Sequence, residues 1–173
     1  VKLALLDTIG CIFNAASNSQ PVSFATTGQY SEIGNPFELS KNITDPRDLG
    51  KFFTTLIRWY DYNDTFLAKE WAHPSDNIGT SLSYFMSNGG SFKEFSESIV
   101  RTYEIQGSLS IGTSLNKEGY DHVFFVKIAS GAIYANLLSK GNEEIIRRTV
   151  NNILLDGPTL RAVSYTHLRA HET

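Results

Sequence analysis

Residues 57–79 hold a dense set of side chains that could take part in acid–base chemistry. Both tryptophans of the chain lie in this stretch. Its ionisable side chains are Arg58, Asp61, Asp64, Lys69, Glu70, His73 and Asp76. Burying so many polar groups among aromatic residues costs free energy unless the groups are paired or used in binding. We therefore expect part of an active site here.

The spacing within this stretch suits the binding of a hydroxy acid. If the helix that precedes it continues to Thr65, then Arg58, Asp61 and Thr65 fall on one helical face. Together they offer a cation, a carboxylate and a hydroxyl group. The proline that follows His73 disfavours helix at the histidine, and the N-terminus of the next helix would present backbone amides to an anion.

Structural roles explain the same residues without any chemistry. Arg58 and Asp61 have the i,i+3 spacing of a helical ion pair, and Asp64 or Asp76 could be a helix cap. His122 lies at a predicted helix start, where a histidine is more often structural. The residue pattern by itself leaves both interpretations open.

The composition is that of an ordinary globular protein and argues against two kinds of partner. With 173 residues, 41% of them hydrophobic and 19% charged, the chain can form one domain with a core. The net charge is −3 and no basic run exceeds Arg147-Arg148, so no nucleic-acid partner is expected. No apolar stretch is long enough to cross a bilayer, so no membrane partner is expected.

Cys11 is the single cysteine of the chain. It allows no internal disulfide and suits a reducing compartment. One thiolate also cannot hold an iron–sulfur cluster. We expect no cofactor.

The hydrophobic pattern predicts an all-α fold. Residues 2–15 are apolar nearly all round, which predicts a buried helix. Residues 17–42 are rich in Ser, Asn, Gly and Thr and read as a loop with a short strand at 21–25. Asp45 and Pro46 form a helix start. The apolar face of that helix is predicted to comprise Leu49, Phe52, Phe53, Leu56, Ile57 and Tyr60.

Capping residues predict the later helices. Ser75-Asp76 should cap a helix that runs to Asn88 and stops at the glycines after it, and Ser91 should cap the next. Two more helices are expected at residues 121–139 and, capped by Asn142, at 143–155. No strand pair is evident.

The last residues do not fit this pattern. Residues 163–173 resemble a peptide that arises when a sequencing adapter is translated, with a junction near Ala162. His167 and His171 have the i,i+4 spacing of a helical metal pair but lack the glutamate of the zincin motif, so no metal site is expected. We divide the chain into a domain at 1–161 and a non-native or disordered tail at 162–173.

Five ordered motifs resemble those of the MmgE/PrpD family, and in particular the branch that dehydrates 2-methylcitrate. They are residues 3–11 (LALLDTIGC), 58–77 (RWYDYNDTFLAKEWAHPSDN), 103–107 (YEIQG), 119–130 (GYDHVFFVKIAS) and 156–161 (DGPTLR). The resemblance implies a large all-helical domain followed by a smaller α+β lid. Residues 1–161 would then be part of the helical domain, with the lid absent.

The resemblance also implies an activity. Members of this family act on small polycarboxylates without an iron–sulfur cluster. The implied reaction is that of a hydro-lyase, which removes water from 2-methylcitrate to give 2-methylaconitate in propionate catabolism. A small tricarboxylate is therefore the expected ligand, and the full-length protein is expected to be a homodimer, cytoplasmic if bacterial and mitochondrial if fungal.

Site residues follow from the match, position by position. Asp61, Thr65 and His73 match the family's active-site motif, and His122 matches its second active-site histidine. We expect His73, His122 and Asp61 to be catalytic, and Thr65 and Arg58 to bind substrate. Two more residues separate Thr65 from His73 than in the decarboxylase branch, and His122 follows Asp instead of preceding Pro.

Part of the family's machinery is expected elsewhere. The family's catalytic lysines would lie beyond Arg161, and Lys69 and Lys127 do not replace them. The alternatives are another chemistry of the family, either decarboxylation of cis-aconitate or epimerisation of a small diacid, or a helical fragment without activity. As a fragment, the chain should expose apolar helix faces and be poorly soluble.

Overall fold

The computed structural model describes residues 1–155, and within them the fold is all-α, as predicted. The helices are α1 (Lys2–Ala16), α2 (Ser19–Ala25), α3 (Pro36–Leu39), η1 (Ser40–Asn42), α4 (Pro46–Arg58), η2 (Pro74–Asn77), α5 (Ile78–Asn88), α6 (Phe92–Gly112), η3 (Asn116–Glu118), α7 (Val123–Leu138) and α8 (Glu143–Leu155). Extended pairing in this range is limited to one antiparallel bridge between Phe66 and Ala72. The expected tail at 162–173 lies outside the described residues.

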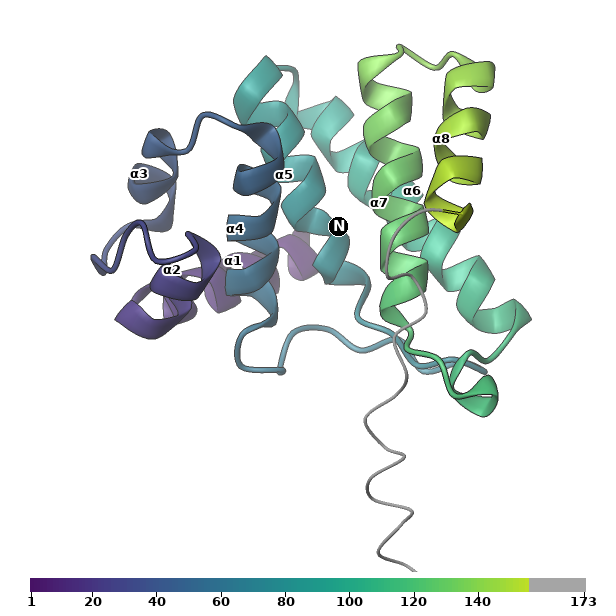
Figure 1. The fold of residues 1–173 in the computed structure, drawn as a ribbon, viewed down its shortest axis with the longest axis horizontal. Helices are drawn as coiled ribbons and strands as arrows, with labels where there is room; N and C mark the ends of the chain where they lie inside the picture. Colours follow the sequence, from purple (N-terminus) through teal and green to yellow (C-terminus); the bar gives the residue numbers. More distant parts are fainter. Residues whose placement is uncertain (156–173) are drawn as a thin grey trace, which may run out of the picture.

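The helices form two groups joined through α5 (Figure 1). Helices α1 to α4 lie on one side, where α4 packs against α1, α2 and α5. On the other side α7 packs against α6 and α8. The connecting segment, residues 59–73, leaves the end of α4, reaches the loop before α7 and returns to α5. It therefore touches both groups.

Five of the six residues predicted for the apolar face of α4 form the centre of the core. The sixth, Tyr60, lies beyond the end of α4 and is 39% exposed, so its predicted place on this face is wrong. Leu49, Phe52, Phe53, Leu56 and Ile57 are all at most 4% exposed. They pack against buried residues of α1, α2 and α5. Burial of each such side chain contributes about 1.5–3 kcal/mol, so this face fixes where α4 ends and the connecting segment begins.

The predicted capping residues are confirmed at three helix starts. The Asp45 carboxylate accepts a hydrogen bond from the Arg47 amide at 2.8 Å. Ser91 and Glu94 form a capping box at the start of α6. The Asn142 side chain accepts from the Ile145 amide at 3.2 Å.

Three local expectations are wrong. Residues 21–25 belong to helix α2, because the Asn18 side chain caps that helix by accepting from the Gln20 amide at 2.9 Å. Helix α1 is buried on one side only, since Leu3 is 82% and Leu6 68% exposed. Helix α5 has no side-chain cap, because Asp76 points into the protein instead. No helix in residues 1–155 is long and apolar enough to cross a membrane.

Candidate active site

The connecting segment leaves the helical path immediately after Arg58. Helix α4 ends there, and Asp61 has a left-handed backbone with φ of 59°, a conformation that aspartate tolerates better than most residues. The helix therefore does not continue to Thr65, and the condition for placing Arg58, Asp61 and Thr65 on one helical face is not met. The side chains of Arg58 and Asp61 nevertheless form an ion pair. A backbone turn, in which the Asp61 amide donates to the Arg58 carbonyl at 3.1 Å, brings the two residues together.

Arg58 is held between an exposed and a buried carboxylate. Its guanidinium pairs with Asp61, which is 70% exposed, and its Nε lies 3.8 Å from Oδ2 of Asp76, which is 5% exposed. Nη1 also donates to Oδ1 of Asn63 at 3.3 Å. Asn63 and Asp76 are buried, so these two residues fix the orientation of the Arg58 guanidinium.

Asp76 is an acid whose charge changes near neutral pH. Burial raises the pKa of its carboxyl group to about 7, although Arg58 and a hydrogen bond from Asn63 act in the opposite direction. That hydrogen bond, from Nδ2 of Asn63, is 2.9 Å long, and the same amide donates to Oγ of Ser75 at 2.8 Å. Asn63 thus joins Arg58 to the residues that follow His73.

His73 is buried, and one of its ring nitrogens has a fixed role. Its Nδ1 lies 2.7 Å from the backbone carbonyl oxygen of Asp64. A carbonyl only accepts, so Nδ1 carries the hydrogen and the neutral ring has its lone pair on Nε2. That Nε2 lies 3.9 Å from Oδ1 of Asp61. Nε2 of His73 is therefore directed towards the predicted site carboxylate.

His122 approaches from the start of α7. Its Nδ1 lies 3.1 Å from Oδ1 of Asp121, whereas its buried Nε2 has no hydrogen-bond partner within residues 1–155. Burial lowers the pKa of this histidine to about 4, and the charges of His73 and Arg58 act in the same direction while Asp121 opposes them. His122 is therefore neutral at pH 7.

Trp71 brings the two histidines together. Its ring centroid lies 4.4 Å from that of His122 and 5.6 Å from that of His73, and the two imidazoles are 5.7 Å apart. The segment that carries Trp71 is anchored by Glu70, a buried carboxylate that accepts from the Asn116 amide at 2.8 Å in the loop before α7.

Four of the five predicted site residues meet in one cluster. Arg58, Asp61, His73 and His122 are linked by the contacts above. Thr65 is exposed, and its hydroxyl forms no hydrogen bond within the described part of the chain. The geometry therefore supplies no contact between Thr65 and the other four.

Sequence reasoning missed the buried residues that support this cluster. Asn63 carried no signal, and Asp76 was interpreted as a possible cap because it precedes a helix. Trp71 was noted only as an aromatic neighbour. Their roles depend on contacts between segments that only the fold brings together.

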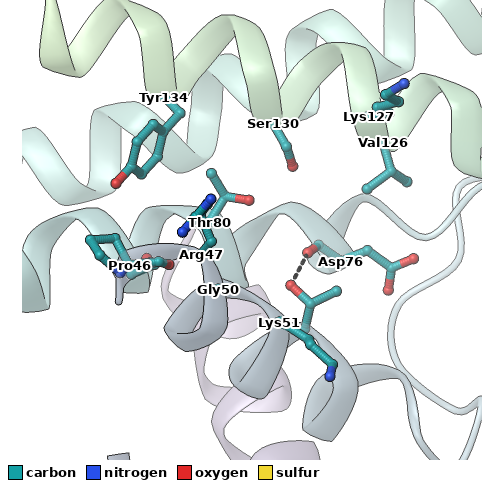
Figure 2. A pocket seen from close by; sticks show the side chains of 12 residues that line it. Pro46, Arg47, Gly50, Lys51, Asp76, Thr80, Val126, Lys127, Ser130 and Tyr134 are labelled. Carbon is teal, nitrogen blue, oxygen red and sulfur yellow. Dashed lines mark hydrogen bonds between the residues drawn. The ribbon is translucent and has the colours of Figure 1, made fainter. Parts of the chain in front are cut away.

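A separate pocket lies between α4, α5 and α7 (Figure 2). It has a volume of about 370 Å³, and Asp76 is among its lining residues. The hydroxyl of Thr54, another lining residue, donates to the Asp76 backbone carbonyl at 3.3 Å. The five predicted site residues are not among the described residues that line it. The candidate site is thus defined by the histidine cluster and not by this pocket.

Among residues 1–155, no group of three or more His, Cys, Asp and Glu side chains is arranged to hold a metal ion.

Comparison with known proteins identifies relatives of the whole chain. A "Probable 2-methylcitrate dehydratase" from Saccharomyces cerevisiae is 33% identical over 96% of this chain and 35% of its own length. A "2-methylcitrate dehydratase" from Escherichia coli is 34% identical over 94% of the chain and 36% of its own length. A "2-methylcitrate dehydratase, mitochondrial" from Yarrowia lipolytica is 32% identical over 96% and 34%. The chain spans about a third of the length of these relatives.

The family assignment is supported by a match to a whole-domain model. The model for the MmgE/PrpD N-terminal domain matches residues 1–172. The all-helical fold of the described residues agrees with this match. The chain therefore belongs to the MmgE/PrpD family, within its N-terminal domain.

Proposed function

We propose that the protein of which this chain forms part eliminates water from 2-methylcitrate to give 2-methylaconitate, as a hydro-lyase of propionate catabolism. The names of the relatives support this substrate. The observation that carries the proposal is the meeting of His73 and His122, with ring centroids 5.7 Å apart, beside the Asp61 carboxylate. The chain spans only about a third of its relatives, so the activity is proposed for the whole protein.

The reaction requires two proton transfers. A base removes a proton next to a carboxylate, and an acid protonates the departing hydroxyl group. Donors or cations must also stabilise the enolate-like charge that develops. Two imidazoles at this separation are suited to share these transfers, because each can reach a different atom of one small substrate.

We assign the base to His122 and the acid to His73. His122 is neutral at pH 7 because its pKa is lowered to about 4, and its Nε2 has no competing partner among the described residues. His73 has acceptors near both ring nitrogens, the Asp64 carbonyl at 2.7 Å and Asp61 at 3.9 Å. The Asp64 carbonyl holds the hydrogen on Nδ1, so a proton carried by Nε2 would face the Asp61 carboxylate and could pass to the departing hydroxyl group.

The remaining predicted residues are proposed to bind the substrate. Asp61 orients the protonated His73 or the substrate hydroxyl. Arg58 faces the substrate on its Asp61 side and binds a carboxylate, while Thr65 donates its exposed hydroxyl to another. The family's lysines, beyond Arg161, would complete the charge balance.

Replacement of His122 tests the assignment. In the full-length protein, His122→Gln should lower kcat for 2-methylcitrate about 10²- to 10⁴-fold, because a general base contributes about that much. Lys69→Met is the control. The Lys69 ammonium makes one hydrogen bond among the described residues, to the Gly112 carbonyl at 3.4 Å, so this variant should leave kcat unchanged. Normal turnover by His122→Gln would remove this histidine from the mechanism.

The substrate is tested separately. Incubation with 2-methylcitrate should give an alkene product, and incubation with cis-aconitate should release no carbon dioxide. Carbon dioxide release would instead support the decarboxylase alternative.

We also propose that the full-length protein is a homodimer, located in the cytoplasm of a bacterial source or the mitochondria of a fungal one.

A further inference from the structure

Asp64 makes hydrogen bonds to three separate parts of the site. Its backbone carbonyl accepts from Nδ1 of His73 at 2.7 Å. Its carboxylate Oδ1 accepts from the Ser75 amide at 2.9 Å, and Oδ2 accepts from the Tyr103 hydroxyl at 2.8 Å. One residue thus joins the imidazole, the chain after it and helix α6.

These bonds close a loop around the histidine. Residues 64 and 75 are joined by the Asp64 carboxylate, and just inside them Phe66 and Ala72 exchange backbone hydrogen bonds of 2.8 and 3.0 Å. Tyr103 ties this closed loop to α6, and its phenol stays a donor at neutral pH because burial and the negative charge of Asp64 raise its pKa. The position of the Asp64 carbonyl is therefore set by the Asp64 side chain.

We propose that Asp64, anchored by Tyr103, is a positioning residue that fixes the tautomer and orientation of His73. The carbonyl at residue 64 requires a hydrogen on Nδ1, so Nε2, on the Asp61 side, is the nitrogen left to exchange a proton with the substrate. If the anchor is lost, the carbonyl moves away and the ring can adopt the Nε2–H tautomer that free histidine prefers. The catalytic consequence rests on the proposed function, whereas the tautomer does not.

The tautomer can be measured without turnover. In the ¹⁵N-labelled 173-residue chain, long-range ¹H–¹⁵N NMR should show a protonated Nδ1 and an unprotonated Nε2 in neutral His73. Tyr103→Phe and Asp64→Ala should each shift a large part of the population to Nε2–H. Asp64→Asn should retain the original tautomer, because its amide oxygen can accept from Ser75 and its NH₂ can donate to Tyr103.

Glu70→Gln is the matched control. Glu70 is a second buried carboxylate in the same segment, but its partners are Ser114 and Asn116 instead of the residues around His73. It should leave the His73 tautomer unchanged. An equal change in Glu70→Gln, or an unchanged tautomer in Tyr103→Phe, would overturn the proposal. Tyr103→Phe decides the question if Asp64→Ala fails to fold.

Kinetics of the full-length protein separate this proposal from the proposed function. A misplaced His73 should lower kcat in Tyr103→Phe by about 10- to 100-fold with a smaller change in KM. Asp64→Asn, which can keep the hydrogen bonds to Ser75 and Tyr103, should retain most of the wild-type kcat. A changed tautomer with unchanged kcat would support the positioning role of Asp64 and overturn the use of His73 as the acid.

Discussion

The two histidines of the candidate site are held in different ways. In the His73 region, residues 58–79, side chains and backbone form a continuous hydrogen-bond network from Arg58 to Tyr103. In the His122 region, residues 121–155, the imidazole is placed by Asp121 and by packing on Trp71, and its Nε2 is unpartnered within the described residues.

The His73 region is preorganised by hydrogen bonds, whereas the His122 region leaves one ring nitrogen open to a ligand. The His73 region fixes the hydrogen on Nδ1 and the direction of Nε2 before any substrate binds. The His122 region keeps a buried nitrogen without a partner, which costs free energy in the absence of a hydrogen bond. That arrangement suits a group whose partner is the substrate, so the two regions are expected to respond differently to perturbation.

The largest predicted effect concerns the helix crossings beneath the two regions. A Cβ at Gly79 would lie 2.7 Å from the Thr54 backbone nitrogen, where α5 crosses α4. Because backbone cannot move aside, Gly79→Ala should lower the free energy of unfolding by about 2–4 kcal/mol. Urea unfolding of the 173-residue chain measures this change.

Gly131→Ala is the matched substitution in the His122 region. Its Cβ would meet the end of the Ile153 side chain of α8, which can change rotamer. The gain in helix propensity offsets part of the clash, so the net change should stay within about 1 kcal/mol. Equal losses in the two variants would show that the α4–α5 crossing is no more rigid than the α7–α8 contact.

The second prediction uses the opposite pH responses of the two regions. The pKa of Asp76 is about 7 in the folded chain, against 3.8 ordinarily. The folded state therefore binds the Asp76 proton more tightly, and this group lowers stability as pH rises from about 4 to 7. The pKa of His122 is about 4 against 6.5, so this group lowers stability as pH falls from about 6.5 to 4. In the wild-type chain the two effects oppose each other.

Removing either group should reveal the other. Asp76→Asn should lose about 2 kcal/mol of stability on acidification from pH 6.5 to 4, after allowance for screening of His122 by water. His122→Gln should instead lose roughly 2–4 kcal/mol as pH rises from 4 to 7. Denaturant unfolding at several pH values measures both slopes. Parallel curves for the two variants would contradict the opposed titration.

Local sequence signals predicted most helix starts, but they did not predict the path of the chain after α4. Asp45 followed by proline, and Ser91 after a pair of glycines, mark helix starts within a few residues, and both starts were predicted. The turn after Arg58 was not, because aspartate permits a left-handed conformation at Asp61 without requiring it. Helix α2 was missed for a related reason, since its cap Asn18 lies among residues typical of loops.

The sequence named the four residues that meet in the histidine cluster, but not the residues that support them. The family motif led to His73 and His122, but their proximity depends on Trp71 and on the anchoring of Glu70 beside α7. Asp64 received its role from Tyr103 on another helix. Such contacts join residues distant in sequence, and no periodicity or spacing encodes them.

The smallest predicted effect concerns a hydrogen bond that joins the two regions. Ser130 of α7 donates to Oδ1 of Asn77 at 2.8 Å, and the Asn77 amide donates to the Pro74 carbonyl at 3.0 Å. Ser130→Ala should lower the free energy of unfolding by about 1 kcal/mol, because one buried acceptor loses its donor. Ser108→Ala, at an exposed position of α6, should change it by less than about 0.5 kcal/mol.

Loss of the Ser130 hydrogen bond should affect the surroundings of His122 and not those of His73. Asn77 keeps its bond to Pro74, so the network around His73 stays closed and the His73 tautomer should not change. Helix α7 loses a tie to that network, so the NMR signals of the His122 ring should shift. If the His73 signals shifted and the His122 signals did not, the network around His73 would depend on α7, and the two regions would not be held independently.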